Sequence, residues 1–343
     1  MSVVIPPVPV GPVGQPDIQY LPDPVKYAAR AERRQKEVDL TRTLPEGFPQ
    51  ELKSDLAWDG KMVDDLKEVE QALQHFKALN LPLGLVNQEA FPLPNLHDNI
   101  RLISEILLGR EFKVIRGVPV DQPADVVLTQ ITDLSRKVDT KTTKADAYTA
   151  EKQVFHTDAG NVVTLFALEE AAEGGQSYLS SSWHVYNELA RTRPDLIHTL
   201  AEPWIAEQGG DVISRPLLYH QPRTSDSPER LIIQYARRGF TGYWGKARAP
   251  PLLPITEAQA EALDALHYLA EKSAVALNFH KGGIQVAYNL TIFHARAGFT
   301  DSNEKRRHLV RLWLRDPDLV WETAEGLKSR WGRIPPLEPF VRS

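Results

Sequence analysis

Residues 155–168 read Phe-His-Thr-Asp-Ala-Gly-Asn-Val-Val-Thr-Leu-Phe-Ala-Leu, a polar His-x-Asp unit followed by an apolar run. The run from Val162 to Leu168 is rich in β-branched and other apolar residues, which favours a β-strand. In an extended chain alternate side chains share one face, so His156 and Asp158 point the same way with Cα atoms roughly 6.6 Å apart. The pair is suited to clamp one cation, but His-x-Asp alone is a weak signal because the chain contains 10 histidines.

The segments around this unit indicate the fold class. Apolar and β-branched runs predict further strands at residues 112–120, 176–181, 231–235, 284–288 and 309–314. Helical periodicity predicts helices at residues 26–40, 59–80, 97–108, 124–137 and 182–200, and one that begins at the capping box Thr256-Glu-Ala-Gln. Because these elements do not alternate as β-α-β-α, we expect an α+β fold with mainly antiparallel sheets.

A second histidine gives the His-x-Asp unit a possible partner. His294 lies in Ile292-Phe-His-Ala-Arg296, directly after the predicted strand 284–288. Two imidazoles and one carboxylate form the facial triad that binds non-haem Fe(II) and leaves open coordination positions. Taken alone, a buried histidine is more often structural than metal-binding. His280 is the alternative distal ligand.

The segment Arg307-His-Leu-Val-Arg-Leu-Trp-Leu-Arg315 also alternates with period two. Arg307, Arg311 and Arg315 therefore share one face of a predicted strand. An exposed strand face that carries arginines is the simplest interpretation. Beside a metal site, however, guanidinium groups are well suited to hold carboxylates in bidentate pairs.

Composition excludes several classes of function. The 343 residues carry a net charge of −5, which argues against a nucleic-acid partner recognised by bulk charge. The absence of cysteine excludes disulfides, thiolate nucleophiles and iron–sulfur clusters, so a metal would need His, Asp or Glu ligands. No apolar stretch approaches the roughly 20 residues of a membrane span, and no signal peptide is recognisable. We therefore expect a cytoplasmic protein without a membrane partner.

Four motifs in order resemble the taurine-dioxygenase (TauD/TfdA) family of Fe(II)- and 2-oxoglutarate-dependent oxygenases, which includes relatives of clavaminate synthase. They are His156-Thr-Asp158, Glu173-Gly-Gly-Gln-Ser177, His294-Ala-Arg-Ala-Gly-Phe-Thr-Asp301 and Arg307-His-Leu-Val-Arg311-Leu-Trp-Leu. The resemblance covers roughly residues 110–318 and is closest in character to fungal members. It implies a double-stranded β-helix, or jelly-roll, core with a helical N-terminal elaboration and helical inserts.

The resemblance also implies a role for each motif. His156, Asp158 and His294 would bind Fe(II), Arg307 would pair with the distal carboxylate of 2-oxoglutarate, and Ser177 would add a hydroxyl hydrogen bond. Arg311 would face an acidic group of the substrate or share the cosubstrate. With dioxygen, such an enzyme would hydroxylate, desaturate or cyclise a small carboxylate-bearing molecule such as an amino acid, in secondary metabolism.

These implications divide the chain into four parts and leave alternatives open. Residues 1–25 form a proline-rich arm, 26–110 a helical elaboration, 111–320 the oxygenase core and 321–343 a tail, all within one catalytic domain. The polar run 139–153 is a candidate lid. A zinc hydrolase that uses the same three ligands, or a non-catalytic barrel that binds a metabolite, are the rival interpretations. The oligomeric state stays open, with a homo-oligomer as one option.

Overall fold

The protein is described from a computed structural model. The described residues are 44–52, 67–81, 112–115, 129–132, 149–208, 211–225, 228–241, 255–277, 280–314 and 324–331, together with isolated positions such as 321. The predicted helix 97–108 and the start of the candidate lid lie outside these ranges, and the predicted helix 26–40 is described only at isolated positions. The predicted helix 59–80 is seen in its described part as α2 (Lys67–Ala78).

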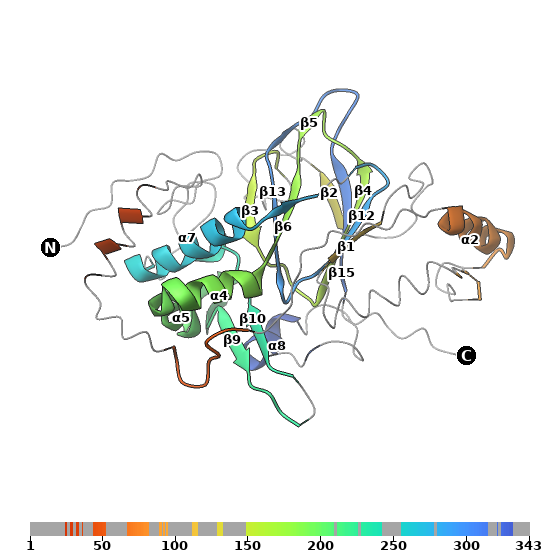
Figure 1. The fold of residues 1–343 in the computed structure, drawn as a ribbon. Helices are drawn as coiled ribbons and strands as arrows, with labels where there is room; N and C mark the ends of the chain where they lie inside the picture. Colours follow the sequence, from red (N-terminus) through yellow and green to blue (C-terminus); the bar gives the residue numbers. More distant parts are fainter. Residues whose placement is uncertain are drawn as a thin grey trace.

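Two antiparallel sheets form the centre of the molecule (Figure 1). One sheet has the order β1 (Phe112–Ile115), β12 (Ile284–Tyr288), β4 (Val162–Glu169), β15 (His308–Leu314) and β2 (Thr129–Thr132). The other has the order β11 (Val275–Ala276), β6 (Ser177–Ser181), β13 (Ile292–Arg296) and β3 (Gln153–His156). Every pair of strands in the described part of the chain is antiparallel, which confirms the expected α+β class with antiparallel sheets.

Three two-stranded sheets extend from the two larger sheets. Two are hairpins, β7 (Trp204–Gln208) with β8 (Asp211–Arg215) and β9 (Leu218–Gln221) with β10 (Arg230–Ile233), and the third pairs β5 (Glu173–Gly174) with β14 (Phe299–Thr300), which are distant in sequence. The pair of β5 and β14 lies at the tip of the structure in Figure 1. It begins the Gly-Gly-Gln-Ser segment, so it positions residues that the site uses.

Three helices lie beside the sheet that contains β3. They are α4 (Ser182–Thr192), α5 (Pro194–Ala201) and α7 (Glu257–Lys272) (Figure 1). Helices α4 and α7 contact strands of this sheet, α7 at β3 and β6, and α5 packs against these two helices. The predicted capping box is present, since the Thr256 hydroxyl accepts from Gln259 N–H and the Gln259 side chain returns to the Thr256 N–H. Leu263 and Leu266 are fully buried against this sheet and its helices.

Two helix predictions were wrong, for different physical reasons. The single helix expected over 182–200 is broken at Arg193, because Pro194 has no N–H to continue the first helix and instead occupies the first position of a second one. Within the helix expected over 124–137, residues 129–132 form strand β2, which pairs with β15. These residues include two threonines and an isoleucine, and pairing with a neighbouring strand outweighs their local helical spacing.

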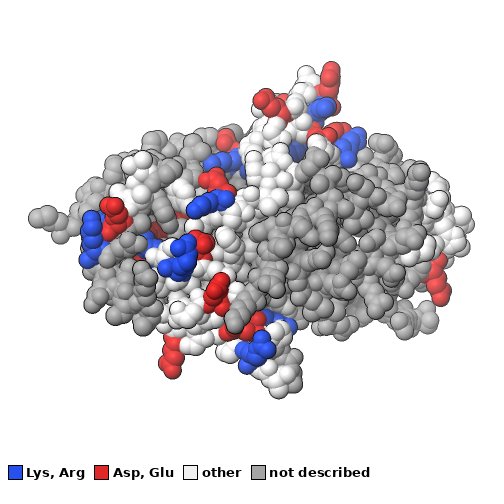
Figure 2. All heavy atoms as spheres, viewed as in Figure 1, with Lys and Arg blue, Asp and Glu red and all other residues white. Residues whose placement is uncertain are grey.

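The smaller elements complete the molecule. Helices α6 (Arg238–Thr241) and α8 (Glu325–Trp331) are short, and α8 buries Leu327 in a cluster that also contains Trp321. The Trp321 ring stacks on Trp183 at 5.9 Å between centroids. On the face shown in Figure 2, acidic and basic side chains are interspersed over the described surface. Among the described residues, no helix has both the length and the apolar character to cross a bilayer.

His267 on α7 should make the protein sensitive to acid. Burial, with a smaller effect of the Arg237 charge, lowers the pKa of His267 to about 3. Neither ring nitrogen has a hydrogen-bond partner among the described residues. In the unfolded chain the His267 imidazole takes up a proton near pH 6.5. The contribution of His267 to the free energy of unfolding is therefore fully present above that pH and is lost as the pH falls toward 3.

A His267→Leu variant should therefore lose less stability than wild type, by about 2 kcal/mol, when the pH is lowered from 7 to 5. Urea unfolding of both proteins at the two pH values measures this difference. His280→Leu, which removes an exposed imidazole, is the matched control. Equal acid sensitivity of wild type and His267→Leu would show that His267 is not neutral in the folded core.

Candidate metal centre

Three predicted ligands meet where the inner faces of the two sheets face one another. His156 ends β3, Asp158 follows two residues later, and His294 is the cross-strand partner of His156 on β13. One ligand atom from each lies within 4.8 Å of the others, and all three residues are buried. The Nε2 atoms of His156 and His294 lie 3.8 and 3.7 Å from the two Asp158 oxygens.

The alternative distal ligand lies elsewhere. The His280 side chain is 61% exposed, and its Nδ1 contacts Glu170 Oε1 at 2.6 Å on the surface. His280 is not a member of the cluster of possible metal ligands. Of the two histidines considered as distal ligand, the structure brings only His294 to the His-x-Asp unit.

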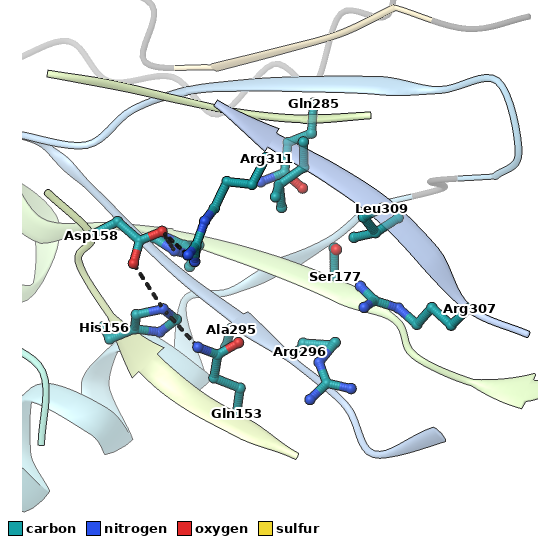
Figure 3. Close-up of a pocket in the computed structure, with 12 residues that line it drawn as sticks. Gln153, His156, Asp158, Ser177, Gln285, Ala295, Arg296, Arg307, Leu309 and Arg311 are labelled. Atoms are coloured by element: carbon teal, nitrogen blue, oxygen red, sulfur yellow. Dashed lines mark hydrogen bonds and ion pairs between the residues drawn. The ribbon is translucent and has the colours of Figure 1, made fainter. Parts of the chain in front are cut away.

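Hydrogen bonding orients the His156 ring toward the cluster. Its Nδ1 lies 2.9 Å from the Val154 carbonyl, which can only accept, so Nδ1 carries the proton and Nε2 is unprotonated, with a lone pair that accepts from Gln153 and that a metal ion would take over. Burial, followed by the nearby His294, lowers the pKa of His156 to about 3, so the ring is neutral at physiological pH. The Gln153 amide donates to Nε2 at 3.0 Å (Figure 3).

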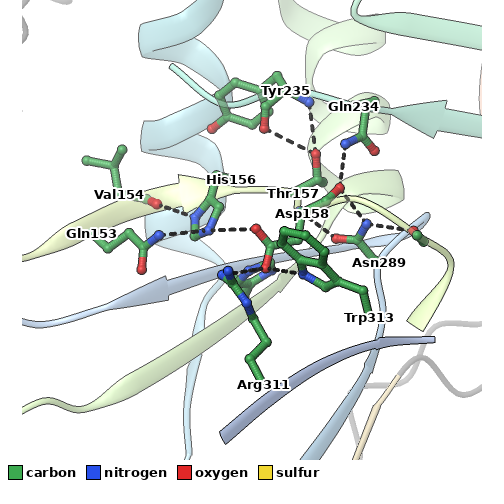
Figure 4. A network of polar contacts seen from close by, with 12 residues as sticks. Gln153, Val154, His156, Thr157, Asp158, Gln234, Tyr235, Asn289, Arg311 and Trp313 are labelled. Carbon is green, nitrogen blue, oxygen red and sulfur yellow. Dashed lines mark hydrogen bonds and ion pairs between the residues drawn. The ribbon is translucent and has the colours of Figure 1, made fainter. Parts of the chain in front are cut away.

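Asp158 is kept ionised although it is buried. Burial opposes its ionisation, but the contact with His294 and the charge of Arg311 outweigh this and hold the pKa of Asp158 well below its usual range. Arg311 Nη1 and Trp313 Nε1 both donate to Oδ2, at 3.1 and 3.0 Å (Figure 4). The carboxylate is thus an anion at neutral pH.

The turn that carries Asp158 is fixed through its backbone. Asn289 Oδ1 accepts from the Asp158 N–H at 2.8 Å, and Asn289 Nδ2 donates to the carbonyls of Asp158 and Gly160 at 2.8 and 2.9 Å. Gln234 Nε2 also donates to the Asp158 carbonyl (Figure 4). These bonds hold the chain direction after β3, so the carboxylate returns toward His156.

A cationic region lies in the same pocket as the three ligands. Arg307 is 6% exposed, and burial, followed by the charge of Arg296, lowers the pKa of its guanidinium to about 9. Arg296 donates to the carbonyls of Thr149 and Glu151. Ser177 lines this pocket with both arginines (Figure 3). A buried cation of this kind favours an anionic ligand.

The Gly-Gly segment makes room for Arg307. Gly175 adopts φ +77°, and a Cβ there would lie 3.2 Å from Cδ and Nε of Arg307. Glycine is therefore needed at this position both for its backbone conformation and for the approach of the guanidinium stem. The sequence prediction had assigned no chemical purpose to these glycines beyond a turn.

Four contributors to the site were not predicted as such, namely Gln153, Gln285, Asn289 and Trp313. Gln285 is 1% exposed, lines the pocket beside Arg311, and has no hydrogen-bond partner for either amide atom among the described residues. Gln285, Leu165 and Arg311 are cross-strand neighbours on β12, β4 and β15. Gln285 is a polar residue within the otherwise apolar strand Ile284–Tyr288, and this position could have indicated a role in the site.

The donor set fits a divalent metal ion. Two imidazoles and one carboxylate match the ligands of the facial triad, and the protonation of the His156 Nδ1 leaves the required nitrogen free. The same pocket offers Arg307 and Ser177 to a carboxylate. The arrangement is thus suited to a ligand that binds a metal with one end and carries a carboxylate at the other.

Comparison with known proteins gives one family and several relatives. The family described as "Taurine catabolism dioxygenase TauD, TfdA family" matches residues 76–313. "Taurine hydroxylase-like protein SAT17" of Stachybotrys chartarum is 31% identical over 338 residues, which cover 85% of this chain and 87% of the relative. "FR-33289 synthase" of Streptomyces rubellomurinus is 26% identical over 198 residues, covering 56% of this chain and 58% of the relative.

The solved structure of an asparagine oxygenase in complex with Fe(II), 3-hydroxyasparagine and succinate is similar in fold. Its TM-score is 0.53 at 14% sequence identity, and the match covers 73% of this chain and 92% of that chain. The asparagine oxygenase has also been solved in a second structure, with a TM-score of 0.51 at 13% identity and coverage of 74% of this chain and 92% of that one. These likenesses confirm the expected jelly-roll core.

Proposed function

Because this chain belongs to the TauD, TfdA family of dioxygenases, we propose that it oxidises an unactivated C–H bond of a small, carboxylate-bearing substrate such as an amino acid. The chain is a non-haem dioxygenase that uses Fe(II), 2-oxoglutarate and dioxygen. We place its activity in secondary metabolism. The observation that carries the assignment of the site is the buried His156, Asp158 and His294 cluster, which shares one pocket with the buried Arg307.

We assign a role to each residue of the pocket. His156, Asp158 and His294 hold the iron, and Arg307 with Ser177 holds the distal carboxylate of 2-oxoglutarate. When bound, iron and 2-oxoglutarate supply the oxidising chemistry, with release of succinate and carbon dioxide. Leu165 and Leu309 line the pocket and reduce its access to water. The fixed tautomer of His156 keeps a nitrogen lone pair directed at the metal position.

Arg311 is assigned to the substrate or to the cosubstrate. One of its donors is used by Asp158, while its Nε is buried and has no partner among the described residues. A guanidinium has five N–H donors, so the pairing with Asp158 leaves others for a carboxylate. The adjacent amide of Gln285 offers a further donor and acceptor to the same ligand.

The remaining assignments concern the whole chain. We propose that the catalytic core is residues 111–320, with the arm 1–25, the helical elaboration 26–110 and the tail 321–343 as parts of the same domain. We also propose a cytoplasmic enzyme that acts on a small molecule, without nucleic-acid or membrane partners. The family match over residues 76–313 supports a core of this extent.

An anaerobic titration of the metal-free protein with Fe(II) and 2-oxoglutarate tests the assignment of the site. The expected result is a weak visible charge-transfer band that saturates at one equivalent of each. Its appearance would allow candidate substrates to be screened by succinate release. Retention of zinc without any band would instead favour the hydrolase or the non-catalytic binding barrel.

Metal content should distinguish the two candidate distal histidines. His294→Ala should lose bound Fe(II) under conditions in which wild type retains one equivalent, because it removes one of three ligands. His280→Ala should keep the wild-type content, since His280 lies on the surface with Glu170. Iron analysis after desalting measures both. Iron loss in His280→Ala with retention in His294→Ala would reverse the assignment.

A further inference from the structure

We propose that Trp313 is a positioning residue that, together with Arg311, holds one oxygen of Asp158, so that the carboxylate offers the metal its other oxygen alone. This inference rests on the proposed function, because it takes Asp158 as a metal ligand. It gives a role to an indole that the proposed mechanism does not use. Trp313 lies on β15, at the edge of the candidate metal centre (Figure 4).

The hydrogen bonds to Asp158 are unequally divided between its two oxygens. Trp313 Nε1 donates to Oδ2 at 3.0 Å and Arg311 Nη1 donates to the same oxygen at 3.1 Å. No described residue donates a hydrogen bond to Oδ1, which lies 3.8 Å from His156 Nε2, while Oδ2 lies 3.7 Å from His294 Nε2. The two donors therefore distinguish Oδ2, which is held by the protein, from Oδ1.

The strand geometry explains why both donors reach the same atom. Arg311 and Trp313 are two residues apart on β15, so their side chains lie on the same face of the strand; Arg311 lines the pocket, and Trp313, which is 39% exposed, lies beside it. The Arg311 guanidinium lies 4.5 Å from the centroid of the Trp313 ring, a cation–π contact that keeps the two side chains together. On the adjacent strand β4, the cross-strand partner of Trp313 is Val163 and that of Arg311 is Leu165.

The number of oxygens through which Asp158 binds would determine how many coordination positions of the metal stay open. Two imidazoles and a carboxylate bound through one oxygen leave three positions of a six-coordinate ion open. A carboxylate bound through both oxygens would leave two. The chelating cosubstrate needs two positions and dioxygen needs one, so the site requires all three. Donors fixed on Oδ2 oppose the rotation that would bring both oxygens to the metal.

The indole is suited to this task in a way that Arg311 is not. An indole N–H is a single, neutral donor on a stiff side chain with two rotatable bonds, and its one hydrogen bond is already made to Asp158. Arg311 carries further donors and lines the pocket, so it is available to a substrate carboxylate. Trp313 therefore keeps Oδ2 occupied when Arg311 turns toward a ligand.

The test compares Trp313→Phe, which keeps an aromatic ring beside Arg311 but removes the N–H, with Trp183→Phe. Trp183 also donates its indole N–H, to the Leu231 carbonyl at 2.7 Å, and does not line the pocket. Each protein is titrated anaerobically with Co(II), as a spectroscopic substitute for Fe(II), and then with 2-oxoglutarate. The metal affinity, the visible cobalt spectrum and the affinity for 2-oxoglutarate are measured.

The expected result is a loss of metal affinity of about 10- to 100-fold in Trp313→Phe, the usual cost of removing a partner of a metal ligand. Its cobalt spectrum should change, its 2-oxoglutarate affinity should fall, and Trp183→Phe should match wild type. Wild-type behaviour of Trp313→Phe, or equal losses in both variants, would overturn the role of Trp313. Failure of the wild-type protein itself to bind the metal would overturn the proposed function instead.

Discussion

Replacing Asp158 with alanine should abolish succinate formation from 2-oxoglutarate. Asp158 is the only carboxylate in the cluster of described residues that can hold the metal, and it contacts both imidazoles. Loss of a group that merely supports a ligand costs about 10- to 100-fold in metal affinity, so loss of the ligand itself should cost more. Fe(II) content and succinate formation, both measured with the purified variant, test this prediction.

Two further variants make the result specific. Asp158→Asn keeps the size of the side chain and removes its charge, and it should also lose the metal. It guards against the alternative that the smaller alanine disrupts the site, because the Asn amide oxygen can still accept hydrogen bonds from Arg311 and Trp313. Glu170→Ala removes an exposed carboxylate that pairs with His280 and should behave as wild type. Normal turnover in Asp158→Ala would refute the assignment of the triad.

Replacing Arg307 with alanine should raise the concentration of 2-oxoglutarate needed for half-saturation by about 10- to 150-fold. This range corresponds to the loss of a charge-assisted pair of about 1.5–3 kcal/mol. Arg307 is buried at the cationic end of the pocket, and burial, followed by the charge of Arg296, lowers its pKa to about 9, so an anionic ligand would be favoured there. The charge-transfer band of the anaerobic complex, titrated with 2-oxoglutarate, measures the shift.

The adjacent arginine provides the control for this change. Arg306 precedes Arg307 in the chain but is exposed, so Arg306→Ala should leave the titration unchanged. Arg307→Lys should lie between wild type and alanine, because an ammonium keeps the charge but lacks the planar fork of the guanidinium. An unchanged dependence on 2-oxoglutarate in Arg307→Ala would show that another residue, such as Arg296, binds the distal carboxylate.

The strands and the His-x-Asp half of the ligand cluster were accessible from the sequence because each depends on a short-range pattern. Apolar and β-branched runs predicted β4 and β12, and period two in β15 predicted the shared face of Arg307 and Arg311. The fold class followed from the order of these elements. The pairing of His294 with His156 did not, because 137 intervening residues must first place β13 beside β3.

The contacts around the ligands could not be predicted because they depend on how the sheets pack. Periodicity placed Trp313 and Arg311 on one face, but only the packing of β15 opposite β3 directs both to Asp158. The role of Asn289 could not be predicted from local sequence patterns, because its side chain binds backbone atoms of a turn that is distant in sequence. The helix predictions failed at Pro194 and at β2, where a local pattern was overruled by a missing N–H and by strand pairing.

The position of β3 has a kinetic consequence. With four residues, it is the terminal strand of its sheet and pairs with β13 alone among the described strands, yet it carries His156 and leads directly to Asp158. A bound metal would therefore link β3 to the neighbouring strand β13 through His156 and His294. Terminal strands open more readily than central ones, so the rate of metal release should follow the opening of β3. Amide hydrogen exchange in residues 153–156 should slow in step with metal loading.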